Sequence, residues 1–478
     1  MQRILSSKEM QYCDNYTINV LGVSEEELVL RAGSSLAEEI SNRYQGGRIL
    51  FVIGKGNNGA DGVVACKKLS LKHSFNVTIL NDFNDLSILN SKFDIIVDCL
   101  FGTGLSRQIE GNYKELIEKI NSSSAIKISC DIPSGINSDN GLVMGVSVKA
   151  DITVVMQEYK YGHFLNDGPD YCGLLVKKDI GIAVFGDNYA NLIEKQDVKE
   201  LFPKRKRNIN KGSCKKATVF GGSKKYFGSV LLSSLALSAL KMGAGYSFLV
   251  VPDSLYGFYA GKNPEIIIKT IPDRNGELIF SANSLKDIIN TDSLAFGMGV
   301  GVSDEVYNTI EYILKNFNGN LLLDADALGT ISTFGLNVLK EKKCRVVITP
   351  HIKEFSRLIN KDVNDVLSDS VSLAKEFAKE YGVIVVLKSA VTIITDGEEL
   401  FINSSGNSAL AKAGSGDVLI GITIGLMNRK ESLLKICASA SFLMGRAAEE
   451  LSIKQNEYTV TATEIISELP SVINGLIY

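Results

Sequence analysis

The chain has 478 residues, of which 45% are hydrophobic and 22% charged, with 43 glycines and 8 prolines. A single hydrophobic core does not extend over this length, so we expect two domains, residues 1–200 and 201–478. The formal net charge of −3 excludes the global positive field that draws proteins to nucleic acid or to acidic membranes. Small molecules are therefore the expected partners, with no nucleic acid and no membrane.

The eight cysteines are scattered, without a CxxC pair or metal-finger spacing. This usage is typical of reduced, buried thiols in a cytoplasmic protein. The first residues lack the apolar core of a signal peptide, and the longest apolar region, 230–251, is interrupted by serines and Lys241. We interpret it as a buried helix and strand, not as a membrane span. Only three histidines are present, which disfavours zinc sites and Ser/His/Asp triads.

The first half alternates helical and strand patterns. Residues 24–44 predict a helix that begins with a capping box of Ser24 and Glu27, and 113–120 is a further helical pattern. Short β-branched runs, each ending in glycine or an acidic residue, predict strands over 48–53, 77–80, 94–98, 125–131 and 152–156. Fully apolar strands alternating with helices indicate a parallel sheet covered on both faces.

Three of these strands end in polar, glycine-containing segments: 54–62, 98–105 and 131–135. Because the carboxyl ends of parallel strands meet at one edge, these segments are expected to converge on a ligand. The first matches G-x-G-x-x-G, with Asp82 after the next strand, as in NAD-binding domains. Asn57 and Asn58 instead favour a cation or a ribose. Each segment is also compatible with a plain turn.

Residues 194–214 change in character and contain the basic run Lys204 to Arg207. We interpret the segment as a solvated linker between the domains. A nuclear or nucleic-acid signal is the alternative, which the acidic balance of the chain disfavours.

The second half repeats the α/β pattern. A helix is predicted over 230–242 and a hairpin over 391–402. Further strands are predicted over 217–220, 246–251, 294–296, 321–323, 346–349 and 384–387. Polar residues again follow the strands. Asp324 and Asp326 are expected as helix caps, or as metal ligands through water. His351 and Lys388 are expected as ligand contacts, or as an ordinary loop histidine and a surface lysine.

Residues 403–427 place Gly406, Gly414, Gly416 and Asp417 directly before an apolar helical pattern. A glycine-rich loop at a helix N-terminus binds phosphate through backbone amides and the helix dipole. A carboxylate in such a site would repel phosphate unless it had a chemical task, so we interpret Asp417 as a base beside a phosphoryl-transfer site. An Asp N-cap is the alternative. The second half resembles the carbohydrate-kinase fold, whose G-x-G-D loop carries the catalytic base.

Both halves together resemble the bifunctional NAD(P)H-hydrate repair enzymes, an epimerase domain fused to an ADP-dependent dehydratase domain. The motifs that carry the resemblance are Arg31-Ala-Gly33, GNNGADG at 56–62, DCLFGTGL at 98–105, DIPSG at 131–135, KGS at Lys211, GGSKKYFGS at 221–229, LDADAL at 323–328, TPHIKE at 349–354, LKSAVTIITDG at 387–397 and AGSGDVLIG at 413–421. The resemblance implies a Rossmann-like three-layer α/β domain followed by a ribokinase-like (carbohydrate-kinase) α/β domain.

The resemblance also implies the site residues and cofactors. Asp131 and Asp417 would be catalytic, and K⁺ would bind Asn58, Asp98 and Ser134. Hydrated NADH or NADPH would contact Asn57, Asn58, Gly59, Ala60, Asp61, Gly102, Thr103, Gly104, Leu105, Ser106, Arg107, Gln108 and Asp131 in the first domain, and Ser229, Gly299, His351 and Asp417 in the second. ADP would contact Lys388, Ser389, Ala390, Val391, Thr392, Asn403, Gly406, Asn407, Ala413, Gly414, Ser415 and Gly416. Mg²⁺ is expected in the dehydratase domain, and the chain is expected to form a homo-oligomer.

The chain departs from the family pattern in places. Ala60 replaces a glycine, where a methyl group could crowd the ligand, and Ser229 replaces an alanine. Two other functions fit the same sequence: a kinase of a small alcohol or vitamin precursor with a regulatory nucleotide-binding domain, and a non-catalytic nucleotide-sensing module. Turnover of hydrated NADH would distinguish the repair enzyme from both.

Overall fold

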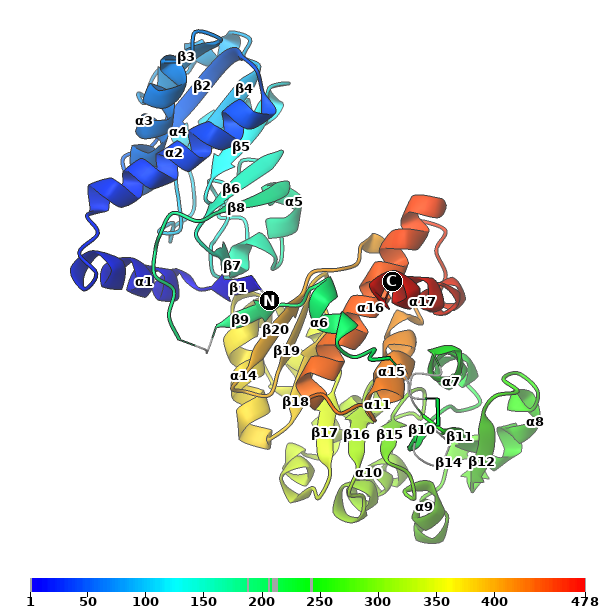
Figure 1. Ribbon diagram of the computed structural model, residues 1–478. Helices are drawn as coiled ribbons and strands as arrows, with labels where there is room; N and C mark the ends of the chain where they lie inside the picture. The colour runs from blue at the N-terminus through cyan, green and yellow to red at the C-terminus, as the bar shows by residue number, and fades with distance from the viewer. Residues whose placement is uncertain (1, 187–188, 205–206, 209–213, 241–243, 478) are drawn as a thin grey trace. The chain divides into compact units, whose positions relative to one another are not determined.

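The computed structural model describes residues 2–186, 189–204, 207–208, 214–240 and 244–477. Two compact units are present, Gln2–Ala190 and Asn191–Tyr478 (Figure 1). Arg205 and Lys206 of the basic run, Lys211 of the KGS motif, and residues 241–242 at the end of the predicted 230–242 helix lie outside the described residues.

The first unit is built on a six-stranded, all-parallel sheet in the order β3-β2-β4-β5-β6-β8. Its strands are β2 (Gly47–Ile53), β3 (Phe75–Leu80), β4 (Ile95–Cys99), β5 (Ile126–Cys130), β6 (Ile152–Met156) and β8 (Leu174–Lys178). The five predicted strands are confirmed, and β8 is additional. A short parallel pair, β1 (Gln2–Leu5) and β7 (Tyr159–Lys160), lies apart from this sheet.

Five α-helices accompany this sheet: α1 (Ser7–Asn19), α2 (Glu25–Arg43), α3 (Asn57–Ser70), α4 (Asn112–Ser122) and α5 (Gly168–Cys172). Helix α1 was not predicted, although Ser6 and Glu9 form a complete capping box at its start. The predicted capping box of α2 is only half formed. The Ser24 hydroxyl accepts the Glu27 N–H, whereas the Glu27 carboxylate accepts a hydrogen bond from Arg31 at 2.9 Å.

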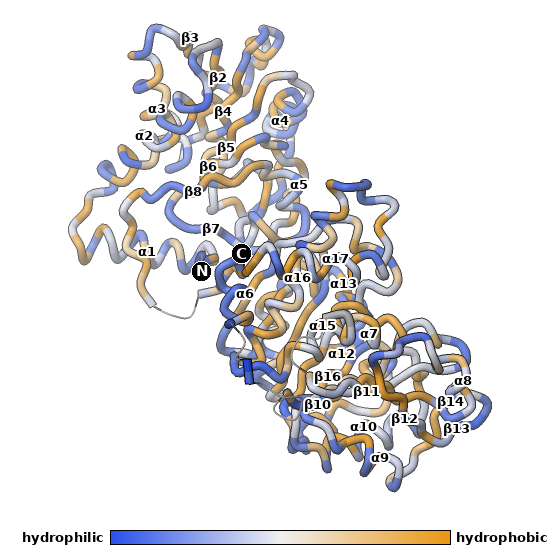
Figure 2. The backbone as a smooth tube through the Cα atoms, turned by 45° about the vertical axis from the view of Figure 1, so that its right-hand side comes forward, coloured by the Kyte–Doolittle hydropathy of each residue, from blue (hydrophilic) through white to orange (hydrophobic). Residues whose placement is uncertain are grey.

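The central strand β2 shows why the sheet is covered on both faces. Alternate side chains point to opposite faces of a strand. Ile49, Phe51 and Ile53 join the core that contains the buried residues of α2 and α3. Leu50 and Val52 join the core that contains Leu116, Ile117 and Ile120 of α4. Figure 2 accordingly shows hydrophobic stretches in the central strands of this sheet, and the unit has three layers.

The second unit is built on a larger sheet in the order β12-β11-β10-β15-β16-β17-β18-β19-β20-β9. Its strands are β9 (Ala190–Leu192), β10 (Lys216–Phe220), β11 (Tyr246–Pro252), β12 (Ile267–Ile271), β15 (Ser293–Phe296), β16 (Asn320–Leu323), β17 (Arg345–Ile348), β18 (Ile384–Leu387), β19 (Thr392–Thr395) and β20 (Leu400–Asn403). Pairing is parallel from β12 to β18, antiparallel in β18-β19-β20, and parallel between β20 and β9. The predicted hairpin is β19 and β20, whereas β9 and β12 were not predicted. A separate antiparallel pair is β13 (Asp273–Arg274) with β14 (Glu277–Leu278).

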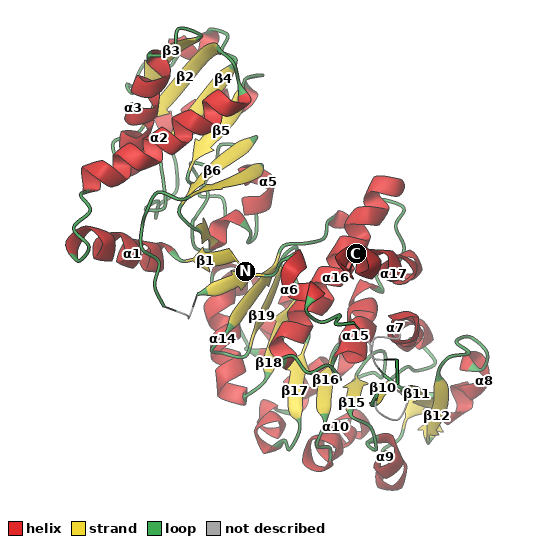
Figure 3. Ribbon diagram, in the orientation of Figure 1, coloured by secondary structure: helices red, strands yellow, loops and turns green. Residues whose placement is uncertain are grey.

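Helices lie between these strands and after them (Figure 3). They are α6 (Lys195–Lys199), α7 (Phe227–Leu240), α8 (Tyr256–Tyr259), α9 (Ala282–Ile288), α10 (Asp304–Asn316), α11 (Asp326–Phe334), α12 (Ile352–Leu358), α13 (Val363–Ser368), α14 (Ser370–Tyr381), α15 (Ser415–Leu426), α16 (Leu433–Lys454) and α17 (Ala462–Ile477). None of the helices in the described part of the chain is long and apolar enough to cross a membrane.

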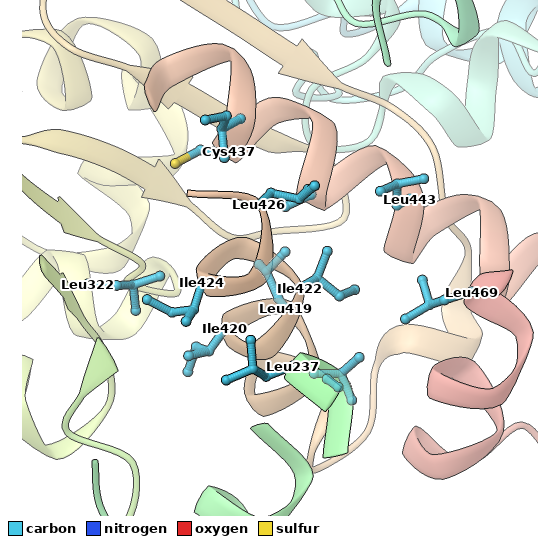
Figure 4. Close-up of a cluster of buried hydrophobic side chains, with 14 of the residues drawn as sticks. Leu237, Leu322, Leu419, Ile420, Ile422, Ile424, Leu426, Cys437, Leu443 and Leu469 are labelled. Carbon is cyan, nitrogen blue, oxygen red and sulfur yellow. The ribbon is translucent and has the colours of Figure 1, made fainter. Parts of the chain in front are cut away.

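Helix α15 is the centre of the core of the second unit. From Val418 to Leu426 every residue is buried, which explains why this stretch is apolar on all sides. Its side chains lie among those of α7, α16, α17 and the sheet (Figure 4). At Gly421 a Cβ atom would lie 2.3 Å from the Ser233 carbonyl oxygen and 2.5 Å from the Ala236 Cβ on α7. The close packing of α7 on α15 therefore requires glycine at this position.

Candidate functional sites

A cavity of about 1100 Å³ lies at the carboxyl ends of β2, β4 and β5 in the first unit. The chain enters β3 on one side of β2 and then returns to β4 on the other side. Ligands of open parallel sheets bind at such a reversal of strand order. Ten of the predicted substrate residues line the cavity: Asn57, Asn58, Asp61, Gly102, Thr103, Gly104, Leu105, Ser106, Arg107 and Asp131. Gly59, Ala60 and Gln108 are not among its lining residues.

The segment predicted as a glycine-rich loop is mostly the first turn of α3, which begins at Asn57. Close packing against neighbouring backbone requires glycine at two positions in and beside this turn, Gly54 and Gly59. A Cβ at Gly54 would lie 1.9 Å from the Leu100 carbonyl oxygen, and a Cβ at Gly59 would lie 2.0 Å from that of Gly54. Asp82 is not among the cavity-lining residues, and its carboxylate accepts hydrogen bonds from Asn84. The geometry therefore does not reproduce the acidic residue of the NAD-binding fingerprint.

Asp131 faces the cavity from the end of β5 with its backbone at a φ of 63°. Its Oδ1 accepts hydrogen bonds from the Met156 N–H at 2.9 Å and from Lys160 Nζ at 2.5 Å. The Lys160 side chain is 1% exposed. His163 lies behind them, where Nδ1 accepts the Lys160 N–H at 3.0 Å, so that Nε2 donates to the Asp131 carbonyl oxygen. Burial, followed by the nearby Lys160, lowers the pKa of His163 to about 4, so the ring is neutral.

Asp14 of α1 and Asp61 of α3 also line the cavity, as do Glu25 and Asp139. Burial raises the pKa of Asp61 to about 8, with added repulsion from Asp131 and Asp14. Burial raises the pKa of Asp14 to about 6, against the attraction of Lys160. The sequence analysis did not identify Asp14, Lys160 or His163. The capping box of Ser6 and Glu9 would have placed Asp14 on a helix, but nothing in the sequence places that helix beside Asp131.

Asn58 lines the cavity and is connected through Phe101 to the hydrogen-bonded pair of Ser134 and Asp98, which are not among the lining residues. The buried Asp98 carboxylate accepts hydrogen bonds from Ser129 and Leu100, and from both the hydroxyl and the N–H of Ser134. Burial raises its pKa. The Asn58 amide donates to the Phe101 carbonyl oxygen at 2.8 Å, whereas its buried Oδ1 has no hydrogen-bond partner. A buried amide oxygen without a hydrogen-bond partner is a candidate ligand for a bound cation.

In the second unit, Asp417 lies in the first turn of α15. Gly414, at a φ of 94°, is the N-cap, and no side chain caps the helix. The interpretation of Asp417 as an N-cap is therefore wrong. Its carboxylate instead accepts a hydrogen bond from the Ser229 hydroxyl on α7. Burial raises the pKa of Asp417 to about 6, although the Ser229 hydrogen bond lowers it.

Three strand ends meet beside Asp417. Asp324, after β16, accepts hydrogen bonds from Thr349 at 2.7 Å and from Lys388 Nζ at 2.8 Å. It is therefore the ion-pair partner of Lys388 and not the predicted cap. Lys388 Nζ lies 3.5 Å from where a Cβ of Gly416 would be, which places the ammonium group at the start of α15. Asp326 accepts the Gly301 N–H at 2.8 Å.

His351 is the N-cap of α12, and its Nδ1 accepts the Glu354 N–H at 3.2 Å. The side chain is 51% exposed. Its backbone forms a parallel bridge with that of Lys388, so the two residues lie at neighbouring strand ends. Gly299 has a φ of 66°, and a Cβ there would lie 2.7 Å from the Tyr226 backbone oxygen. His351 therefore caps α12 and also lies next to Lys388.

The predicted ADP residues fall into two groups. Residues 388–391 form the turn from β18 to β19, Thr392 begins β19, and Asn403 ends β20. The loop that follows is fastened to α16, because the Gly406 N–H donates to Glu449 at 2.7 Å and the Asn407 amide to Ser452 at 2.9 Å. Ala413 and Gly414 lead into α15, whose first two residues are Ser415 and Gly416. The sequence analysis did not identify the role of Glu449, since the contact joins residues 43 positions apart.

Together, the two units define a two-domain α/β enzyme with a small-molecule cavity in one unit and a carboxylate at a helix N-terminus in the other. A family model described as NAD(P)H-hydrate dehydratase matches residues 217–471. A second model, described as YjeF-related protein N-terminus, matches residues 25–92 and 76–162. The chain belongs to the family of bifunctional NAD(P)H-hydrate repair enzymes.

Relatives over the whole length support this assignment. The bifunctional NAD(P)H-hydrate repair enzyme of Thermofilum pendens is 31% identical, over 99% of this chain and 97% of its own. The enzyme of the same name from Coxiella burnetii is 30% identical, over 95% of this chain and 96% of its own.

Solved structures support the fold of the second unit. A Bacillus subtilis ADP/ATP-dependent NAD(P)H-hydrate dehydratase, co-crystallised with ATP and Mg²⁺, matches with a TM-score of 0.52 and 24% identity, covering 60% of this chain and 99% of that one. A ribokinase-like superfamily protein from Enterococcus faecalis matches with a TM-score of 0.51 and 23% identity, covering 62% and 98%. The second unit therefore has the ribokinase-like fold.

Proposed function

We propose that this protein repairs hydrated NADH and NADPH. The first domain, residues 1–200, interconverts the R and S hydrates as an isomerase. The second, residues 201–478, is a lyase that dehydrates the S hydrate while ADP is converted to AMP and phosphate. The observation that carries the proposal is the presence of both sites in one chain that aligns over its full length with relatives of that name.

The geometry around Asp417 supports phosphorylation of the substrate hydroxyl as the first dehydratase step. With a pKa of about 6, Asp417 is ionised at neutral pH and accepts the proton of the ring hydroxyl as that oxygen attacks the terminal phosphorus of ADP. The amides of the first turn of α15 stabilise charge on the transferred phosphoryl group. The ring nitrogen then donates its electron pair as the phosphate leaves, and loss of the ring proton gives NADH or NADPH.

Lys388 and the loop of residues 403–416 are suited to hold the nucleotide. Lys388 is kept at the start of α15 by Asp324, and the attachment of the loop to α16 orders it before ADP binds. Among the described residues no group of three His, Cys, Asp or Glu side chains is placed to hold a metal ion. We therefore propose that Mg²⁺ is held mainly by the ADP phosphates and water, where it neutralises phosphate charge.

The first domain is proposed to bind K⁺ through Asn58, Asp98 and Ser134. The ion would satisfy the unpaired Asn58 oxygen and neutralise the buried Asp98 charge. By holding these residues, K⁺ would fix Phe101 and the cavity-lining loop that follows it. Asp131 would assist the interconversion of the hydrates.

Incubation of the protein with a mixture of R and S hydrates tests the proposal. With ADP, both hydrates are expected to disappear and NADH to form, whereas without ADP the protein only equilibrates the hydrates. A kinase of another alcohol, or a nucleotide sensor, would leave the hydrate unchanged with ADP or ATP, and that result would overturn the proposal.

Replacement of K⁺ by Li⁺ is expected to lower the rate of epimerisation at least about tenfold, because a small, strongly hydrated ion fits this donor set poorly. Chiral chromatography of the hydrates without ADP measures the rate. Asn58→Ala is expected to remove the dependence on K⁺. Equal rates in both ions would contradict the proposed K⁺ site.

Ala60→Gly is expected to change the kcat and KM of epimerisation less than about twofold. Ala60 is not among the cavity-lining residues, so its methyl group does not crowd the ligand. Glycine in the first turn of a helix costs up to about 1 kcal/mol, so a slightly lower melting temperature is expected. A large gain in kcat/KM would show that the methyl group hinders the substrate.

The homo-oligomeric state and the cytoplasmic location remain predictions.

A further inference from the structure

Eight charged side chains line the cavity of the first unit, and four of them, from four different segments, act on one another electrostatically. They are Asp14 on α1, Asp61 on α3, Asp131 after β5, and Lys160 at the end of β7. The other four are Glu25, Lys55, Arg107 and Asp139. Because like charges in a buried site cannot all be ionised cheaply, at least one of the carboxyl groups of Asp14, Asp61 and Asp131 retains its proton at neutral pH.

The Lys160 ammonium group forms an ion pair with the Asp131 carboxylate. Its Nζ lies 2.5 Å from Asp131 Oδ1 and also donates to the Met156 carbonyl oxygen at 2.9 Å. The Met156 N–H donates to the same Oδ1. An ammonium group and a backbone N–H thus both donate to one oxygen of Asp131 and fix the position of its carboxylate.

In the described part of the chain, the Asp61 carboxyl group has no such ammonium or N–H donor. The charged groups that act on it are Asp131 and Asp14, and beneath it lie the buried thiols of Cys99 and Cys130, which are uncharged at neutral pH. Asp14 is attracted by Lys160. Asp61 is therefore the carboxyl group that holds the proton, consistent with its pKa of about 8.

We propose that Asp61 is the general acid and Asp131 the general base of the epimerisation, with Lys160 as the positioning residue for Asp131. This assignment rests on the proposed function of the first domain. The two carboxyl groups come from different segments of the cavity lining, one from the first turns of α3 and the other from just after β5. A substrate ring between them would present one face to each group, as inversion of a ring carbon requires.

The reaction begins with proton transfer from Asp61 to the hydroxyl oxygen on the ring carbon next to nitrogen. The C–O bond breaks, its electron pair leaves with water, and the nitrogen lone pair forms a C=N⁺ bond. A water molecule then adds to the opposite face of the same carbon. Its proton passes to Asp131, and the π electron pair returns to nitrogen. The pair of carboxyl groups holds one proton before and after the reaction and none while the C=N⁺ bond exists. The reverse reaction starts with that proton on Asp131.

Oxygen exchange in the wild-type protein tests the route. In H₂¹⁸O without ADP, each inversion is expected to replace the ring hydroxyl oxygen, so the newly formed hydrate is two mass units heavier. Retention of the original oxygen during inversion would indicate that the ring opens and recloses without loss of water, and would overturn the proposal. Failure of the wild-type protein to interconvert the hydrates at all would instead overturn the proposed function itself.

The variant Asp61→Asn tests the residue. Its kcat for epimerisation is expected to fall by about 10² to 10⁴ with little change in KM. The loss of kcat/KM that is expected of wild type above about pH 8 should be absent from the variant. Asp82→Asn, the same substitution on the exposed surface, is the matched control. An unchanged kcat with a raised KM would show that Asp61 only binds substrate. If Asp61→Asn does not fold, the alkaline limb of the wild-type pH profile decides, because its absence would also overturn the assignment.

Discussion

Asp417→Asn is expected to lower the kcat of dehydration on the order of 10³-fold while ADP and hydrate still bind. The amide keeps the shape of the side chain and can still accept the Ser229 hydrogen bond, but it cannot take the proton of the substrate hydroxyl. Formation of NADH from the S hydrate and ADP, followed at 340 nm, measures the rate. Isothermal calorimetry with ADP measures binding.

The epimerase activity of the same variant is the internal control, because Asp131 lies in the other unit. It is expected to be unchanged. In wild type, kcat/KM for dehydration should fall tenfold per pH unit below about pH 6, where Asp417 becomes protonated and neutral. A variant that keeps wild-type turnover would exclude Asp417 as the base.

Gly421→Ala is expected to destabilise the second unit by about 2 to 3 kcal/mol. The new methyl group would lie 2.3 Å from the Ser233 carbonyl oxygen on α7, and backbone cannot move aside as a flexible side chain can. Helices α7 and α15 must therefore separate and weaken the core around α15. Calorimetry of the full chain should show a lower melting temperature for the transition of the second unit only.

Gly329→Ala is the matched control for this substitution. Gly329 lies in α11, and the nearest atom to its added Cβ is Val302 Cγ2 at 3.4 Å, an ordinary contact. Alanine is the better helix former by about 1 kcal/mol, so this variant should be as stable as wild type or more so. Equal effects of the two substitutions would show that the close contact at Gly421 relaxes without cost.

Short-range patterns were sufficient for most of the fold. Strands β2, β4 and β15 are mostly apolar and, apart from the first two residues of β2, are buried, and such strands are recognisable from composition alone. The missed elements lack that signal. Strand β8 contains the partly exposed Lys177 and Lys178, and in β12 only Ile271 is buried. Helix α1 has a weak apolar periodicity. Their formation depends on neighbours that are distant in the sequence.

The same distinction applies to the two sites. Sequence identified residues that follow strands, such as Asp131 and Lys388, because parallel strands bring their carboxyl ends together whatever the details of the fold. It did not identify which of these side chains pair. The contacts of Lys160 with Asp131, of Lys388 with Asp324 and of Ser229 with Asp417 join residues 29, 64 and 188 positions apart.

The sequence by itself determined the α/β class of both halves, the glycines beside the ligand segments, and the candidate base Asp417. Strand periodicity, glycine placement and the order of residues at strand ends are local properties of the chain. Only the tertiary structure decided that Asp417 bonds to Ser229 and does not cap α15, that Ala60 is not among the cavity-lining residues, and that Asp14 and Asp61 share a cavity with Asp131. Charge state and orientation depend on burial and on partners from other segments, which the linear sequence does not contain.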